Sequence, residues 1–156
     1  MEFRQTIERS WLDVNPMAEY ILFDYPIPHD QNIEKIWKQI STLRHQVYAD
    51  ELGQYETNSE QKIDDPGHHF IACIEEGRLA GYVSLNPPSK QPFRIARYFS
   101  NDTLEQTVFS LCAQRLPSTY EVRALTVSPD FRGKNISLRL MRYALEFILK
   151  RGGTDV

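Results

Sequence analysis

The sequence has little of several features that would assign it to a specialised class of protein. Its 156 residues contain two cysteines, Cys73 and Cys112, which lie far apart and in apolar surroundings. We therefore expect buried free thiols rather than a disulfide or a metal site. No stretch approaches the roughly 18 apolar residues of a membrane span, and the N-terminus lacks the apolar core of a signal peptide. These absences favour a cytoplasmic protein.

Excess charge of one sign is also missing. The formal net charge is −3, with 41% hydrophobic and 25% charged residues. This balance is ordinary for a soluble globular chain and gives no basic footprint for nucleic acid or an anionic membrane. There is no internal repeat or low-complexity segment. The length suits one domain over residues 1–156, with a polar N-terminal arm at 1–18.

Hydrophobic periodicity indicates several regular elements. Residues 19–28 read as a strand that prolines end. Residues 29–55 predict a long helix, capped by Asp30 and stopped near Gly53. Residues 68–88 predict a hairpin with its turn at Glu76-Gly77.

The second half continues the alternation of strands and helices. Residues 89–99 are expected to be irregular or extended, and 101–117 helical. Residues 119–127 predict a strand, in which one face carries Val122, Ala124 and Thr126 and the other Arg123, Leu125 and Val127. A helix is expected from 136 to about 151. This order predicts an α+β or mixed α/β fold around one mostly antiparallel sheet.

The turn before the last helix has features of an anion site. A helix that begins near Asn135 presents unpaired N–H groups and the positive end of its dipole. Gly133 allows close approach of a ligand, and Arg132 and Lys134 add positive charge. A diphosphate would suit this turn, since several donors converge. The alternative is an ordinary strand-to-helix turn with solvated basic residues, because a single glycine is a weak phosphate signal.

The segment EVRALTVSPDFRGKNIS resembles the acyl-CoA-binding segment of the GNAT (GCN5-related N-acetyltransferase) superfamily. The positions on that register are Glu121, Leu125, Val127, Pro129, Arg132 and Gly133. The resemblance implies that the backbone of Leu125, Thr126 and Val127 pairs with a pantetheine arm. It also implies that the coenzyme A diphosphate is received by the N–H groups of Arg132, Gly133, Lys134, Asn135, Ile136 and Ser137. The co-substrate would be acyl-CoA or acetyl-CoA, without a metal.

Two positions depart from the usual glycines of this turn. Asn135 occupies the second position, and asparagine tolerates a left-handed backbone better than most residues. Ser137 occupies the third, where it is small and can cap the helix. Both add atoms where a phosphate would approach.

Upstream segments are similar to acyl-homoserine-lactone synthases and related N-acyl amino acid synthases, which take an acyl group from acyl carrier protein or coenzyme A. The matching positions are Arg44, Tyr48, Leu52, Gly53 and the pair Asp64/Asp65. The positions that differ are Gln54, Ser84 and Ala124. Arg123 lies one residue before the usual arginine and is expected on the opposite face of its strand. We therefore expect acyl transfer to an amine but not lactone synthesis.

Amine acylation needs a base and donors for the oxyanion. Glu121 is the candidate base, with a solvent-exposed carboxylate as the alternative, and a backbone N–H near Leu125 is the candidate oxyanion donor. Arg44 could shape the acceptor site by pairing with Asp64 or Asp65, or form a surface salt bridge, and Tyr48 could face substrate or the core. His68-His69 has no carboxylate or cysteine at ligand spacing, so no zinc site is expected.

The resemblance implies a further strand, a helix and two strands after the last helix. GGTDV resembles the start of that strand, so we expect the C-terminal part of the fold to be absent and the exposed sheet edge to promote self-association. Three functions remain open: an N-acyltransferase with a small amine acceptor, a non-catalytic GNAT-like binding or assembly module, and an unrelated α+β binding domain.

Overall fold

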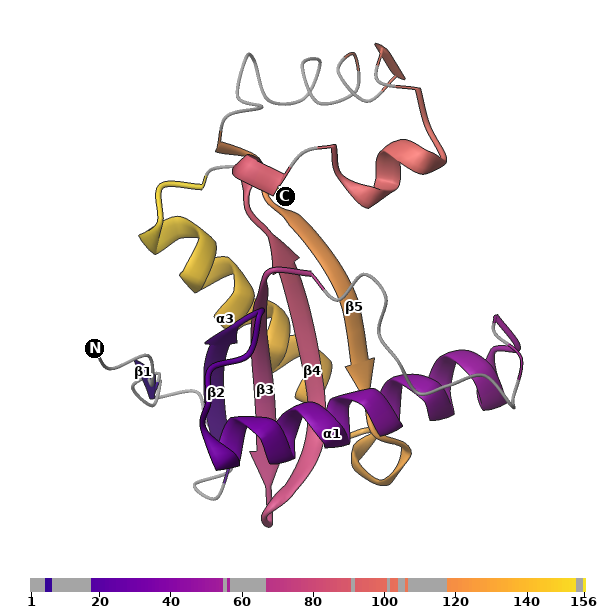
Figure 1. Cartoon of the computed structure of the whole chain (residues 1–156), viewed down its shortest axis with the longest axis vertical. Helices are drawn as coiled ribbons and strands as arrows, with labels where there is room; N and C mark the ends of the chain where they lie inside the picture. Colours follow the sequence, from indigo (N-terminus) through magenta and orange to yellow (C-terminus); the bar gives the residue numbers. More distant parts are fainter. Residues whose placement is uncertain are drawn as a thin grey trace.

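A computed structural model describes residues 5–6, 18–54, 56, 67–90, 92–100, 102–103, 106, 118–153 and 156. The strands are β1 Gln5–Thr6, β2 Ala18–Asp24, β3 His69–Glu75, β4 Arg78–Asn86 and β5 Glu121–Val127. They form one sheet in the order β1-β2-β3-β4-β5, with antiparallel neighbours throughout. The helices α1, Gln31–His45, and α3, Ile136–Lys150, lie on opposite faces of this sheet (Figure 1). The expected α+β fold is confirmed.

Helix α1 follows the predicted pattern closely. Asp30 caps it by accepting the N–H groups of Asn32 at 2.8 Å and Ile33 at 3.1 Å. Its buried residues are Ile33, Ile36, Ile40 and Leu43, and they pack on Phe23, Phe70 and Tyr82 of the sheet. The helix continues as a π-helix, η1, Gln46–Glu51, and Gly53 follows in a left-handed conformation with φ 61°.

Helix α3 packs closely on the other face because one strand residue has no side chain. A Cβ at Gly81 of β4 would lie 2.7 Å from the Thr126 carbonyl oxygen and 3.2 Å from side-chain atoms of Ile136 and Leu140. Glycine therefore allows the first turns of α3 to approach β4 and β5. Leu140, Ala144 and Ile148 complete the core on this side.

Two expectations about the strands meet different outcomes. The hairpin turn is confirmed, with Glu76 at φ 54° and Gly77 at φ 73°. The strict alternation expected along 119–127 is wrong, because Val122 and Val127 both pack on the α3-side core while Ala124 packs on the α1-side core. The register with β4 shifts between Tyr82 and Ser84, so Ala124 and Leu125 both lie opposite Val83. After this β-bulge, the side chains of β5 lie on the opposite faces of the sheet from those that strict alternation predicts.

The N-terminal arm and the segment after β4 contain regular structure that the sequence did not predict. Part of the N-terminal arm, β1, pairs with β2. The segment expected to be irregular or extended instead contains two 3-10 helices, η2, Pro88–Lys90, and η3, Arg94–Arg97. The helix expected at 101–117 lies mostly outside the described residues, as do Cys112, Asp64 and Asp65. Among the described helices, none is long and apolar enough to cross a membrane.

Candidate functional site

The turn between β5 and α3 has the geometry of an anion site. A 3-10 turn, η5, Pro129–Phe131, follows β5, and buried Phe131 anchors it. Gly133 has φ 83°. Asn135 is the N-cap of α3 at φ 59° and ψ 20°, without a side-chain hydrogen bond to the helix. Asn135 thus adopts the left-handed conformation that asparagine tolerates, and its side chain leaves the first N–H groups of α3 uncapped.

The helix-capping role expected of Ser137 is wrong. Asn135 is the N-cap, so Ser137 is the second helical residue and its side chain is exposed. A capping side chain must precede the first helical residue in order to accept an N–H from the second or third. Ser137 therefore presents its backbone N–H, and not a cap, to the turn.

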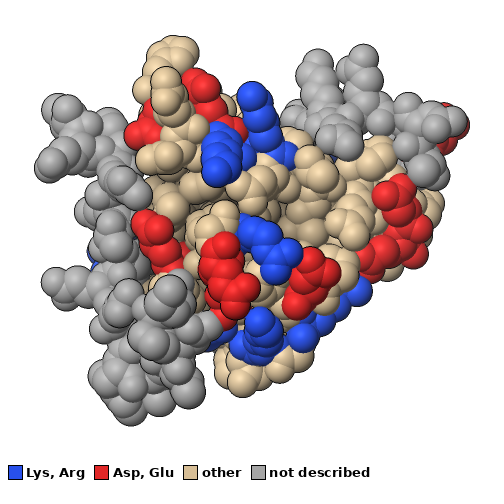
Figure 2. Space-filling model, turned by 90° about the horizontal axis from the view of Figure 1, so that it is seen from below, with Lys and Arg blue, Asp and Glu red and all other residues tan. Residues whose placement is uncertain are grey.

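Charged side chains surround this turn without gathering into one sign. Lys134 lies 5.0 Å above the Phe131 ring, and Arg139 donates to the Lys134 carbonyl at 3.1 Å. Arg132 is paired with Glu51 at 2.8 Å. Figure 2 views this end of the molecule and shows basic and acidic side chains interspersed. The local basic charge expected from Arg132 and Lys134 is present, but an acid from a distant element offsets part of it.

The β-bulge places strained backbone in the middle of β5. Ala124 has φ 46°, a conformation that costs a non-glycine residue about 1–2 kcal/mol. Of the three described non-glycine residues with positive φ, two are Ala124 and Asn135. Both therefore lie in the segment whose pattern suggested acyl-CoA binding. A bulge of this kind takes a residue out of the ladder and leaves backbone groups free for another partner.

Glu121 lies at the start of β5 and is not a solvent-exposed carboxylate, because its side chain is 10% exposed. Asn86 donates from Nδ2 to Glu121 Oε2 at 2.8 Å, and the N–H of Ile95 donates to Oε1 at 3.0 Å. Arg123 is similarly buried, with Nε 3.9 Å from Glu121 Oε2. The bonds from Asn86 and Ile95 fix the direction of the carboxylate.

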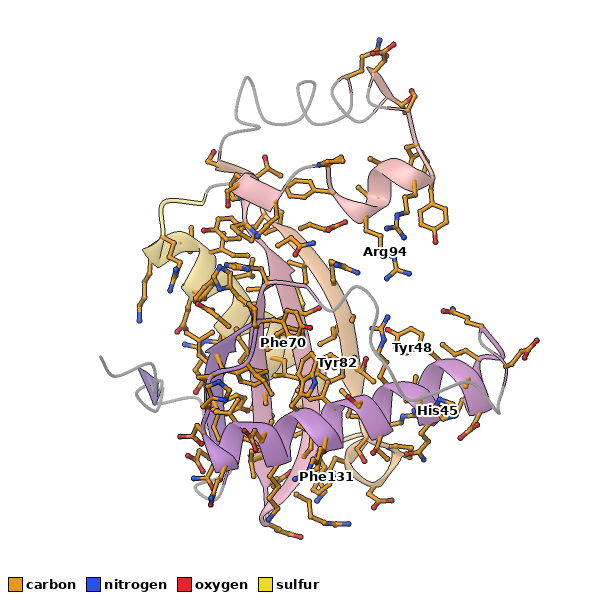
Figure 3. The ribbon with its side chains drawn as sticks, in the orientation of Figure 1. His45, Tyr48, Phe70, Tyr82, Arg94 and Phe131 are labelled. Carbon is orange, nitrogen blue, oxygen red and sulfur yellow. The ribbon has the colours of Figure 1, made fainter. Side chains whose placement is uncertain are left out.

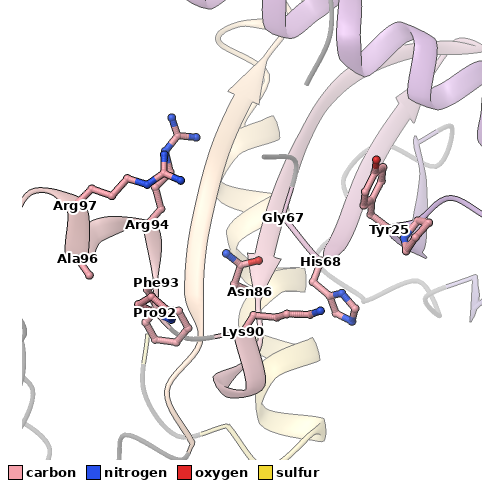
Figure 4. A pocket seen from close by; sticks show the side chains of 11 residues that line it. Tyr25, Gly67, His68, Asn86, Lys90, Pro92, Phe93, Arg94, Ala96 and Arg97 are labelled. Atoms are coloured by element: carbon pink, nitrogen blue, oxygen red, sulfur yellow. The ribbon is translucent and has the colours of Figure 1, made fainter. Parts of the chain in front are cut away.

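A cavity of about 720 Å³ lies beside Glu121. Its lining includes Asn86, which donates to Glu121, and Phe93 and Arg94, which precede Ile95 in the chain. The cavity extends to Tyr25 and His68 (Figure 4). Lys90 and Arg97 also line it, and none of its described lining residues is acidic. Sequence reasoning missed this cavity because its wall comes from the segment 86–97, which carries no recognisable motif.

The two predicted substrate residues lie near the bulge. The Arg44 guanidinium lies 5.0 Å above the Tyr48 ring. Next to them is Tyr82, which is opposite Thr126 of β5. Burial raises the pKa of the Tyr82 hydroxyl, although the positive charge of Arg44 opposes the shift. Figure 3 shows Tyr82 between Arg94 and Phe131, which mark opposite ends of β5. Tyr82 was not singled out from the sequence.

Sheet pairing brings a carboxylate to the paired histidines, although none lies at ligand spacing in the sequence. Asp24 is opposite His69 in the sheet, with His69 Nδ1 and Asp24 Oδ1 2.5 Å apart. The possible ligand atoms of Asp24, His68 and His69 all lie within 4.8 Å of one another. The hydrogen bond from His69 lowers the pKa of Asp24 despite partial burial. Desolvation lowers the pKa of His68, so burial disfavours its charged form.

Comparisons with known proteins agree with this fold. The Acetyltransferase (GNAT) family matches residues 31–156. A crystal structure of a candidate acetyltransferase from Pyrococcus horikoshii matches with a TM-score of 0.50 and 12% identity, over 87% of this chain and 77% of that chain. This likeness concerns the fold. A search of curated proteins found no match.

Proposed function

The chain belongs to the GNAT acetyltransferase family, and from this premise we propose that it is an N-acyltransferase. It transfers an acetyl or longer acyl group from acyl-CoA, or from the phosphopantetheine of acyl carrier protein, to a small amine. The backbone geometry of 121–137 carries the proposal, because both left-handed residues, Ala124 and Asn135, lie where a thioester donor would bind. Strained residues persist where the fold requires them, and functional sites concentrate them.

The donor is proposed to bind along β5 and the turn that follows it. The diphosphate would accept the N–H groups of Gly133, Asn135, Ile136 and Ser137. The N–H groups of Arg132 and Lys134 would join them only after leaving the Pro129 and Phe131 carbonyls, to which they donate at 3.3 Å and 3.4 Å. The pantetheine arm would pair with the backbone of Leu125, Thr126 and Val127. Leu125 is exposed in the structure, which is consistent with a ligand at this edge of the sheet.

The chemistry is proposed to take place near Glu121. Because protein donors already bond both of its oxygens, Glu121 acts on the ammonium through a water molecule. The amine nitrogen then attacks the thioester carbonyl, and a backbone N–H near Leu125 stabilises the oxyanion. The carbon–sulfur bond breaks, and the thiolate leaves and is protonated. No metal takes part in this sequence.

The acceptor amine is proposed to enter from the cavity beside Asn86 and Arg94, where Glu121 lies within one hydrogen bond of the wall. Arg44 and Tyr48 lie closer to the bulge and are proposed to border the acyl group or the acceptor. A cytoplasmic location and self-association through the sheet edge belong to the same proposal. The finer resemblance to lactone and N-acyl amino acid synthases stays a prediction.

A thermal melt and a thiol assay test this function together. We expect coenzyme A at about one hundred times its Kd to raise the free energy of unfolding by about 2.7 kcal/mol. With acetyl-CoA or a longer acyl-CoA and a mixture of small amines, free thiol should be released in proportion to amine. Binding without amine-dependent release would identify a non-catalytic module. The absence of stabilisation at millimolar coenzyme A would refute donor binding.

A further inference from the structure

Arg132 belongs to the turn that is proposed to receive the donor diphosphate, and its side chain is already paired with an acid from a distant part of the chain. Arg132 donates from Nη2 to Glu51 Oε2 at 2.8 Å and to Oε1 at 3.1 Å. The two side chains are 50% and 33% exposed, so a ligand can reach both. The Glu51 carboxylate is therefore bonded to the guanidinium that would otherwise be available to a diphosphate.

Glu51 reaches this position through an irregularity at the end of α1. It is the last residue of the π-helix η1, where the N–H of Leu52 bonds to the carbonyl of Val47 at 3.0 Å. π-helical turns are rare and frequently lie at functional sites. Because η1 extends the long helix past the sheet, an acid of the first half of the chain meets the turn of the second half.

The other charges near the turn are engaged differently. Asp130 pairs with Arg78 at 3.1 Å, and Lys134 lies above Phe131. Arg139 bonds a backbone carbonyl. Within the part of the chain that the structure describes, Glu51 is the acid bonded to a residue of the 132–137 segment.

We propose that Glu51 sets the choice of acyl donor by competing with the diphosphate of coenzyme A for Arg132. This inference rests on the proposed function, which assigns the diphosphate to this turn. Displacing the Glu51 carboxylate costs its charge-assisted hydrogen bonds to Arg132, and sharing Arg132 weakens those bonds and brings like charges together. Pantetheine alone carries no charge and escapes this opposition. A carrier-protein donor, held by a single phosphodiester, is opposed less than coenzyme A.

The Glu51→Gln variant tests this competition, with Glu146→Gln as the matched control. Glu146 is paired with Arg142 at 3.0 Å on α3, so the control removes one paired acid away from the turn. Calorimetric titration should show about three- to tenfold tighter binding of coenzyme A to Glu51→Gln at low salt. Pantetheine binding should be unchanged, and the gain should shrink as salt screens the charges.

A second variant keeps the proposal falsifiable. If Glu51 competes for Arg132, the gain from Glu51→Gln should disappear in a protein that also carries Arg132→Gln. A gain that persists undiminished there would overturn the competition. Weaker coenzyme A binding by Glu51→Gln, or an equal change for coenzyme A and pantetheine, would overturn it as well. Loss of coenzyme A binding in every folded variant, the unmodified protein included, would instead refute the proposed function.

Discussion

The two ends of β5 are built in different ways. At its C-terminal end, the turn 128–137 is made by consecutive residues and is proposed to receive the donor diphosphate. At its N-terminal end, Glu121 is held by Asn86 and Ile95, which come from β4 and η3. The first end is a local motif and the second is an assembly of distant segments. The proposed function assigns donor binding to the first end and the chemistry to the second.

The largest expected effect separates the two ends directly. We expect Glu121→Gln to lower kcat by about 10²- to 10⁴-fold, since the base is lost while the side-chain volume is kept. The Kd for coenzyme A should not change, because the diphosphate turn lies at the other end of β5. Steady-state thiol release and a binding titration measure the two quantities. A comparable loss of donor affinity would show that the two ends are not independent.

A smaller effect is expected where α3 meets the sheet. Gly81→Ala would place a Cβ 2.7 Å from the Thr126 carbonyl oxygen, and the required shift should cost about 1–3 kcal/mol of stability. Because Thr126 and Ile136 are the neighbours, donor affinity should fall with stability. Leu149→Ala is a suitable control, since the Leu149 side chain is 66% exposed on α3. Equal urea midpoints for the two variants would contradict this packing account.

The smallest expected effect is on stability and concerns Asp24, which lies near the cavity-lining residue His68. Its lowered pKa means that it stabilises the fold above the pKa of the unfolded side chain, about 3.8, and that this contribution is lost as pH falls through the folded pKa. Asp24→Asn should therefore lower Tm modestly at neutral pH, with the difference vanishing in acid. Melts from pH 7 to pH 2 measure it. A difference that grows as pH falls would contradict the assignment.

The sequence predicted the local end of β5 better than the assembled end. Periodicity placed α1, the hairpin and α3, and the left-handed conformation of Asn135 is one that the sequence motif allowed. The bulge at Ala124 was missed because no residue type signals it, and strict alternation then misassigned the faces of 123–127. The neighbours of Glu121 and the contact between Asp24 and His69 were missed because sheet register joins residues far apart in the chain.

The most direct test of the account is one titration of coenzyme A into Arg132→Gln and Glu121→Gln. The account predicts that Arg132→Gln weakens binding by about tenfold at low salt, through the loss of a charge-assisted contact to phosphate. Glu121→Gln should bind as the unmodified protein does. Equal affinities for all three proteins would contradict the assignment of the donor diphosphate to the turn after β5.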